Sequence, residues 1–286
     1  MQPGVDVASF KGLECLRLAA RDGSTAMVCR HGGHVLSWVD AAGDERLFLS
    51  ERAVFGGEAA IRGGVPVCFP QFSGLGDLPK HGFVRNRAWS IAESGAKGDG
   101  AFAELLSADD AASRALWPHA FRASLKVALA PGRLDLQLTI ANTGDAPFGF
   151  TGALHTYFAV DDIGRVAITG LAGREYRDAA GGNAIRTESA PGVTFAGEVD
   201  RVYHEVGNAL ELADGTRRLR VTGSGFRDVV VWNPWRTLCA GLPDMAPEGY
   251  RRMVCIEAAA ARVPVTVAAG SSWSGGQSLE VLPTSG

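Results

Sequence analysis

The twenty residues FRASLKVALAPGRLDLQLTI, positions 121–140, decide the fold class of this chain. Apolar and polar side chains alternate on both sides of the turn sequence Pro131-Gly132. Because a period of two places every second side chain on one face of a strand, the stretch predicts a β-hairpin with one buried face. The same strand-like pattern occurs at 88–107 around a loop at 97–100, at 210–222 around Asp214-Gly215, and at 263–267 and 278–282, which are parted by 269–272.

Helical periodicity is nearly absent from the sequence. The best candidate, 111–116, is long enough for little more than one turn of helix. Many short strands with turn signals and no alternating helices are typical of antiparallel sheets packed face to face. No internal repeat or long linker interrupts the pattern. The sequence therefore predicts an all-β fold, a large antiparallel β-sandwich, with residues 1–286 in a single domain.

The composition is that of an ordinary globular protein and excludes several classes. The chain has 286 residues, of which 46% are apolar and 21% charged, with a formal net charge of −3. A chain of this length buries roughly three-quarters of its unfolded surface, so it needs neither disulfides nor a metal to fold. The nearly neutral charge gives no reason to expect nucleic acid or an anionic membrane as a partner. No apolar run approaches the ~20 residues of a membrane span.

The cysteines and the first residues predict a cytoplasmic protein. The five cysteines are widely spaced and form no C-x-x-C pair, which favours reduced, buried thiols over disulfides or a zinc site. The first eleven residues include Asp6 and lack the apolar run of a secretory signal.

Four segments break the alternation with dense polar, glycine and aromatic residues, namely 61–73, 78–86, 154–158 and 250–257. His155 lies in an apolar run, where a buried imidazole needs a hydrogen-bond partner and has a pKa near neutrality. Glu257 ends an apolar strand-like run, where burial of a carboxylate is costly without a partner. Arg62, Lys80 and Arg85 are cations in loops rich in glycine and proline, which can approach an anionic ligand closely. Together these groups suit proton transfer on a polar or anionic substrate.

Each of these residues also has a structural interpretation. A histidine in an apolar strand is often a hydrogen-bonded core residue, and a glutamate at a strand end is often solvated or salt-bridged. Arginines in loops often tie those loops together. Trp232 and Trp235 can stack on a sugar or pack in the core.

Taken together, the segments resemble the D-hexose-6-phosphate mutarotase (glucose-6-phosphate 1-epimerase) family, a branch of the galactose mutarotase-like superfamily. The matching motifs occur in the order of that family and span Arg62 to Glu257, roughly two-thirds of the chain. They are RGGVPVCFPQF from Arg62, LPKHGFVRN from Leu78, LHTYF from Leu154, EVDRVY from Glu198, WNPW from Trp232 and YRRMVCIE from Tyr250.

The resemblance implies a β-supersandwich and specific roles for several residues. His155 matches the catalytic histidine of the LHTYF motif, and Glu257 matches the catalytic glutamate that closes RMVCIE. The implied substrate-contacting residues are Arg62, His81, Arg85 and Asp200, to which Lys80 adds a candidate phosphate contact.

The implied reaction interconverts the α and β anomers of a hexose 6-phosphate without a metal or other cofactor. A base removes the proton of the C1 hydroxyl while an acid protonates the ring oxygen, and the opened ring closes on the other carbonyl face. Glu257 as base and His155 as acid fit these roles. The implied partner is a small sugar phosphate, and we expect a monomer.

Three other functions remain open from the sequence. An aldose 1-epimerase acting on unphosphorylated sugars would have no use for the cluster of Arg62, Lys80 and Arg85. A non-catalytic sugar-phosphate-binding protein would not need both His155 and Glu257. A glycoside hydrolase would need two carboxylates about 5–10 Å apart, for which Asp244, Glu248 and Glu257 are candidates.

Overall fold

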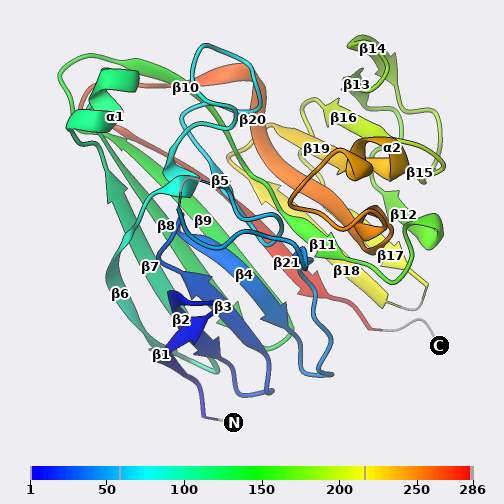
Figure 1. Ribbon diagram of the computed structural model, residues 1–286, viewed down its shortest axis with the longest axis horizontal. Helices are drawn as coiled ribbons and strands as arrows, with labels where there is room; N and C mark the ends of the chain where they lie inside the picture. Colours follow the sequence, from blue (N-terminus) through cyan, green and yellow to red (C-terminus); the bar gives the residue numbers. More distant parts are fainter. Residues whose placement is uncertain (1, 58, 216, 284–286) are drawn as a thin grey trace.

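The computed structural model describes residues 2–57, 59–215 and 217–283, and its strands there form three antiparallel sheets (Figure 1). The four-stranded sheet comprises, in spatial order, β1 (Gly4–Phe10), β2 (Leu13–Ala19), β3 (Thr25–Cys29) and β4 (His34–Val39). The eight-stranded sheet comprises β14 (Ala184–Thr187), β13 (Glu175–Asp178), β16 (Val199–Tyr203), β19 (Asp228–Asn233), β20 (Met253–Val267), β10 (Phe148–Leu154) and β5 (Val67–Cys68), with β11 (Tyr157–Ala159) also paired to β20. The nine-stranded sheet comprises β15 (Gly192–Val193), β12 (Val166–Thr169), β17 (Leu210–Asp214), β18 (Arg217–Ser224), β21 (Ser272–Val281), β9 (Arg133–Asn142), β8 (Phe121–Ala130), β7 (Gly100–Ala108) and β6 (Ser90–Lys97).

Helices are few and short in the described residues. They are α1 (Ala111–Leu116), α2 (Trp235–Ala240) and the 3-10 turns η1 (Val84–Asn86), η2 (Ile163–Arg165) and η3 (Gly249–Arg252). The helices α1 and α2 lie toward opposite ends of the long axis (Figure 1). None of the helices in the described part of the chain has the length and apolar content that crossing a bilayer requires.

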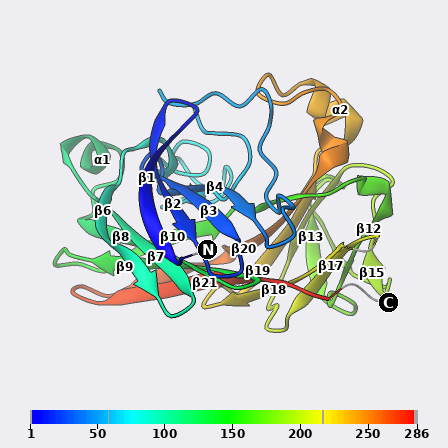
Figure 2. The same ribbon diagram turned by 90° about the horizontal axis from the view of Figure 1, so that it is seen from below.

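The main hydrophobic core lies between the sheets. Leu125 of β8 and Leu138 of β9 face Val254 and Ile256 of β20 in one continuous cluster of buried side chains. The strands β1 and β2 of the four-stranded sheet pack over β6 and β7 of the nine-stranded sheet (Figure 2). The predicted all-β, antiparallel sandwich is therefore confirmed, with a third, smaller sheet added to its two large ones.

The predicted hairpin at 121–140 is the pair β8 and β9. Leu125 pairs with Leu138 and Val127 with Leu136 across the turn, and these four side chains are buried. Their neighbours along each strand are more exposed, as the alternation requires. The hairpins predicted at 88–107 and 210–222 and the helical turn at 111–116 are also present.

The strand β20 is longer than predicted. The sequence pattern indicated a strand-like run at 253–257 and a separate strand at 263–267, whereas β20 runs unbroken from Met253 to Val267, and its residues 253–261 are all buried. A strand that is covered on both faces has apolar side chains on both of them. Its sequence therefore lacks the alternation of apolar and polar residues that marks a half-exposed strand. One face of this segment packs in the core, and the other face carries the candidate site.

Two other elements differ from the prediction. The strand β21 begins at Ser272, ahead of the predicted 278–282, through the polar stretch SWSGGQ. Gly276 lies against β9 there, where a Cβ would come within 2.6 Å of the Leu136 carbonyl oxygen, so only glycine fits this approach. The helix α2 was not predicted; the Asn233 side chain accepts a hydrogen bond from the amide of its first residue, Trp235.

Candidate active site

The candidate site lies on the face of the eight-stranded sheet that points away from the main core. Cross-strand pairs place Val230 beside Glu257 and Trp232 beside Cys255. Directly paired residues of adjacent strands project to the same face, so these side chains share one surface. The β10–β20 register pairs Leu154 with Ala258, and its continuation by one residue brings His155 opposite Glu257.

His155 and Glu257 lie in direct proximity although about a hundred residues separate them in the chain. The distance from His155 Nε2 to Glu257 Oε1 is 3.4 Å, and the two side chains are only 9% and 2% exposed. The remaining polar atoms, His155 Nδ1 and Glu257 Oε2, are buried and have no hydrogen-bond partner among the described residues. The pair therefore has unused hydrogen-bonding capacity beside a cavity.

Burial shifts the pKa values of the two groups in opposite directions. Desolvation raises the pKa of Glu257 well above its ordinary value, and the charge of Asp200 adds to the effect. Desolvation lowers the pKa of His155 well below 6.5, reinforced by the neighbouring His81, Arg85 and Arg62. Burial thus favours the neutral form of each group.

Aromatic rings fix the orientation of the His155 imidazole. The ring stacks on Tyr157 with centroids 4.7 Å apart and an angle of 11° between the planes. Trp232 and His81 contact it edge-on. The Tyr157 hydroxyl in turn accepts a hydrogen bond from Arg62 Nη1 at 3.1 Å. A ring held on several sides keeps its Nε2 aimed at Glu257.

The pair opens onto a cavity of about 310 Å³. Six of the seven residues predicted for the site line this cavity, namely Arg62, Lys80, His81, His155, Asp200 and Glu257. Arg177 of β13 and Trp232 of β19 line it as well. Arg177 was missed in the sequence because no motif surrounds it. Its pairing with Val202, one strand from β19, brings it to the cavity.

Arg85 is the one predicted residue that does not line the cavity. Its Nη2 donates a hydrogen bond to the Lys80 carbonyl oxygen at 2.9 Å, so its guanidinium lies against the backbone of the 78–86 loop. The expectation of a direct substrate contact is therefore not supported by its placement. Its charge still acts on the site, because it helps to lower the pKa values of His81 and His155.

Arg62 and His81 are both held by neighbours. Arg62 Nε donates to Asp244 Oδ2 at 3.1 Å, so Asp244 is committed to this ion pair. His81 Nδ1 accepts a hydrogen bond from the Ser73 amide at 3.3 Å, which leaves the ring proton on Nε2. His81 and Ser73 have φ angles of 66° and 50°. Residues other than glycine rarely adopt this left-handed backbone conformation, and such strained positions are common at functional sites.

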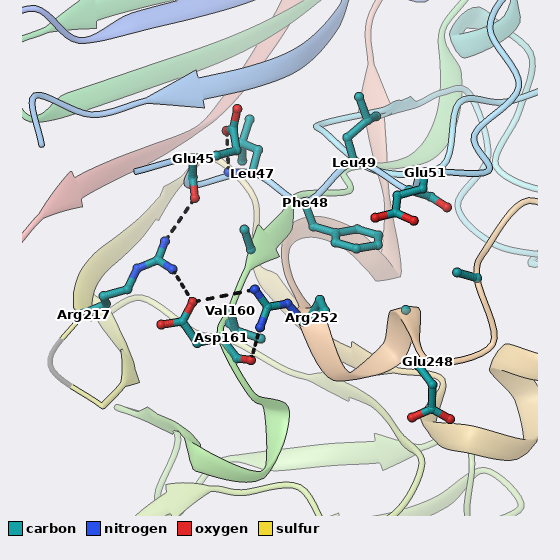
Figure 3. A pocket seen from close by; sticks show the side chains of 14 residues that line it. Glu45, Leu47, Phe48, Leu49, Glu51, Val160, Asp161, Arg217, Glu248 and Arg252 are labelled. Carbon is teal, nitrogen blue, oxygen red and sulfur yellow. Dashed lines mark hydrogen bonds and ion pairs between the residues drawn. The ribbon is translucent and has the colours of Figure 1, made fainter. Parts of the chain in front are cut away.

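A second, larger cavity of about 540 Å³ lies elsewhere on the protein (Figure 3). Its two arginines are both engaged by Asp161: Arg217 donates to the Asp161 carboxylate at 3.0 Å, and Arg252 donates to the Asp161 carbonyl oxygen. Glu248 lines this cavity, and no histidine is among its lining residues. The cavity at His155 and Glu257 is therefore the better candidate for acid–base chemistry, despite its smaller volume.

The buried histidines make the folded state sensitive to acid. Burial lowers the pKa of His34 to about 4 and that of His81 to about 3, and His155 is shifted in the same direction. The unfolded chain binds protons at these rings as the pH falls through 6.5, whereas the folded chain does not, so acid favours unfolding. From pH 6.5 to pH 5 the rings of His34 and His81 each remove about 1–2 kcal/mol of stability. His155 acts in the same direction, and the raised pKa of Glu257 acts against it.

Urea denaturation at the two pH values measures this loss. The variant His34→Gln keeps a donor for the Gly63 carbonyl oxygen, which His34 contacts at 2.7 Å, and should lose less stability at pH 5. Equal stability of the wild type at pH 6.5 and pH 5 would contradict the expectation.

The fold and the site define a class: a β-sandwich protein with a buried imidazole–carboxyl pair at the base of a cavity lined by cations. Residues 14–280 match the family described as Aldose 1-epimerase. The chain belongs to the aldose 1-epimerase family and is an isomerase.

Similar proteins agree with this assignment. The chain is 38% identical over 290 residues to a protein of Cenchrus ciliaris named "Putative glucose-6-phosphate 1-epimerase", with 98% of this chain and 88% of that protein covered. A protein of Escherichia coli K12 with the same name is 35% identical over 233 residues, which cover 80% of this chain and 77% of that protein. The crystal structure of a "putative mutarotase" from Salmonella typhimurium superimposes with a TM-score of 0.90 at 27% identity, covering 98% of this chain and 94% of the other. The resemblance seen in the sequence motifs is thereby confirmed.

Proposed function

We propose that this protein interconverts the α and β anomers of a hexose 6-phosphate, with glucose 6-phosphate as the preferred substrate. The observation that carries the proposal is the His155–Glu257 pair, 3.4 Å apart at the base of a cavity that Lys80 and Arg177 also line. The names of the relatives from Cenchrus ciliaris and Escherichia coli support the choice of substrate.

In the proposed mechanism Glu257 is the base and His155 the acid. Glu257 takes the proton of the C1 hydroxyl as His155 donates one to the ring oxygen, and the C1–O5 bond breaks to give the aldehyde. Rotation about C1–C2 followed by the reverse transfers gives the other anomer. Because both reacting oxygens are bonded to C1, two groups only 3.4 Å apart can reach them together.

The proposed step needs a protonated His155 and an ionised Glu257, whereas burial favours the neutral form of each group. Hydrogen bonds from sugar hydroxyls to the carboxylate favour its ionised form, and the charge of Lys80 acts in the same direction. Substrate binding therefore prepares the pair by moving one proton across the gap between Glu257 and His155. No proton is gained or lost in this rearrangement.

The other lining residues suit the polar groups of the substrate. We propose that Lys80 and Arg177 bind the phosphate, because Arg62 is already engaged by Asp244 and Tyr157. Arg62 and the Nε2–H of His81 then contact sugar oxygens, and Asp200 accepts hydrogen bonds from hydroxyls. Arg85 acts indirectly through the backbone of Lys80.

We propose further that the chain acts as a single domain and as a monomer. One hydrophobic cluster includes residues of all three sheets, which supports the single domain. Reduced cysteines and a sugar phosphate substrate both suit the cytoplasm.

Anomer exchange measured by NMR saturation transfer tests the substrate class. We expect kcat/KM for glucose 6-phosphate to exceed that for glucose by at least about tenfold, because charge-assisted hydrogen bonds to phosphate each contribute about 1.5–3 kcal/mol. The variants Lys80→Ala and Arg177→Ala should lose this preference by a raised KM, whereas Arg122→Ala, exposed on β8, should not. Equal exchange of both sugars would instead indicate an epimerase for unphosphorylated sugars, and no exchange would indicate a binding protein.

A further inference from the structure

We propose that a zinc ion binds to His155, Cys255 and Glu257 and inhibits the protein by occupying its acid–base pair. The ligand atoms of these three residues all lie within 4.8 Å of one another, and all three residues are buried. Binding of zinc does not depend on the reaction assigned above, whereas inhibition rests on that proposed function.

The spacing of the ligand atoms suits zinc. Two ligands of a tetrahedral zinc, one nitrogen and one oxygen at about 2.0–2.1 Å from the metal, lie about 3.3 Å apart. His155 Nε2 and Glu257 Oε1 are 3.4 Å apart without any adjustment. Cys255 is two residues before Glu257 on β20, so its sulfur projects from the same face of the strand. Small side-chain rotations would complete three corners of a tetrahedron.

The second carboxyl oxygen of Glu257 could also take part in binding a metal. Glu257 Oε2 is buried without a hydrogen-bond partner in the described part of the chain, although the Glu257 side chain is only 2% exposed. A buried carboxyl oxygen without a partner is stabilised when it binds a hydrogen-bond donor or a cation. The fourth corner of the tetrahedron would face the cavity that His155 and Glu257 line, which gives the ion an entry path and a site for water.

The charges balance when zinc is bound. The Cys255 thiol and the Glu257 carboxyl each release a proton to solvent as the S–Zn and O–Zn bonds form, and His155 binds as neutral imidazole. Zn²⁺ with one thiolate and one carboxylate has no net charge, which suits a buried position. A set of one sulfur, one nitrogen and one oxygen favours zinc over magnesium, which prefers oxygen ligands and water.

The site is better suited to an inhibitor than to a resident metal. A histidine that holds a structural or catalytic metal usually donates its second ring N–H to a partner. His155 Nδ1 has no hydrogen-bond partner among the described residues. Zinc would also block both groups that the proposed reaction needs, since the lone pairs that move protons would be bound to metal.

Two measurements on the full chain test the proposal. Isothermal titration calorimetry of the metal-free protein with zinc should show one binding site per chain. The same titration with magnesium should give no heat of binding. Cobalt in place of zinc should give a thiolate-to-cobalt charge-transfer band. The variant Cys255→Ala should weaken zinc binding by more than about tenfold and remove the band. The variant Cys239→Ala removes another buried thiol, one that contacts the Ala246 carbonyl oxygen, and should change neither.

Anomer exchange then tests inhibition separately. Zinc should abolish exchange in the wild type at the concentration that fills the site, and a chelator should restore it. The absence of a zinc site, or a site that Cys255→Ala leaves unchanged, would overturn the proposal. Zinc binding without loss of exchange would overturn the inhibition alone. If the metal-free protein has no exchange activity, the proposed function fails while the calorimetry still decides on the site.

Discussion

Replacing Glu257 by glutamine should lower the rate of anomer exchange on glucose 6-phosphate by about 10³–10⁴-fold. Glutamine keeps the size and most of the polarity of the side chain but cannot take a proton from the C1 hydroxyl. Because burial already favours the uncharged form of Glu257, the neutral amide should fold without a large loss of stability. The measurement is the exchange rate by NMR, with thermal unfolding as the check on folding.

A matched substitution separates this effect from a general loss of charge. Glu248 lies at the other cavity and pairs with Arg251 on the surface, so Glu248→Gln should leave exchange within about twofold of the wild type. KM should change little in Glu257→Gln, since the base acts mainly in the transition state. A rate within threefold of the wild type would rule out Glu257 as the base.

Replacing His155 by glutamine should lower the same rate by about 10²–10³-fold. Glutamine can hydrogen-bond to the ring oxygen but cannot protonate it, and the stack on Tyr157 is lost. The effect is smaller than that of Glu257→Gln because water in the cavity can supply a proton to the leaving oxygen. Exchange close to the wild-type rate in His155→Gln would contradict the assignment.

The pH dependence of exchange provides a control for the same pair. Activity needs one proton on the pair, so the wild-type rate should fall at low pH as a second proton binds and at high pH as the shared proton leaves. The lowered pKa of His155 moves the acid limb of the pH–rate profile to lower pH, and the raised pKa of Glu257 moves the alkaline limb to higher pH. The pH range over which the rate is constant therefore widens. In His155→Gln the rate should instead rise with pH, because only the ionisation of Glu257 remains.

Much of the fold could be predicted from the sequence because its strands are exposed on one side. The alternation in 121–140 survives because one face of β8 and β9 meets solvent. The segment 253–261 of β20 is buried on both faces and therefore carries no such signal. The prediction was thus least complete for the strand that bears Glu257.

The site residues were predicted from sequence motifs, and a motif does not specify the direction in which a side chain points. Arg85 belongs to a matching motif, yet its guanidinium lies along the Lys80 backbone. Arg177 belongs to no motif and reaches the cavity because β13 pairs with β16. The approach of Cys255 to His155 likewise depends on the β11–β20 register. Such neighbours follow from strand pairing, which local sequence does not encode.

The two faces of β20 have different roles, and this has a consequence for the redesign of the protein. Glu257 lines the cavity and serves the proposed reaction, whereas Val254 and Ile256 pack in the main core. The cations that would select a substrate come from other segments, the 78–86 loop and β13. Libraries randomised at Lys80 and Arg177 should therefore change the preference for phosphorylated over unphosphorylated sugars while leaving Glu257, His155 and the core packing untouched.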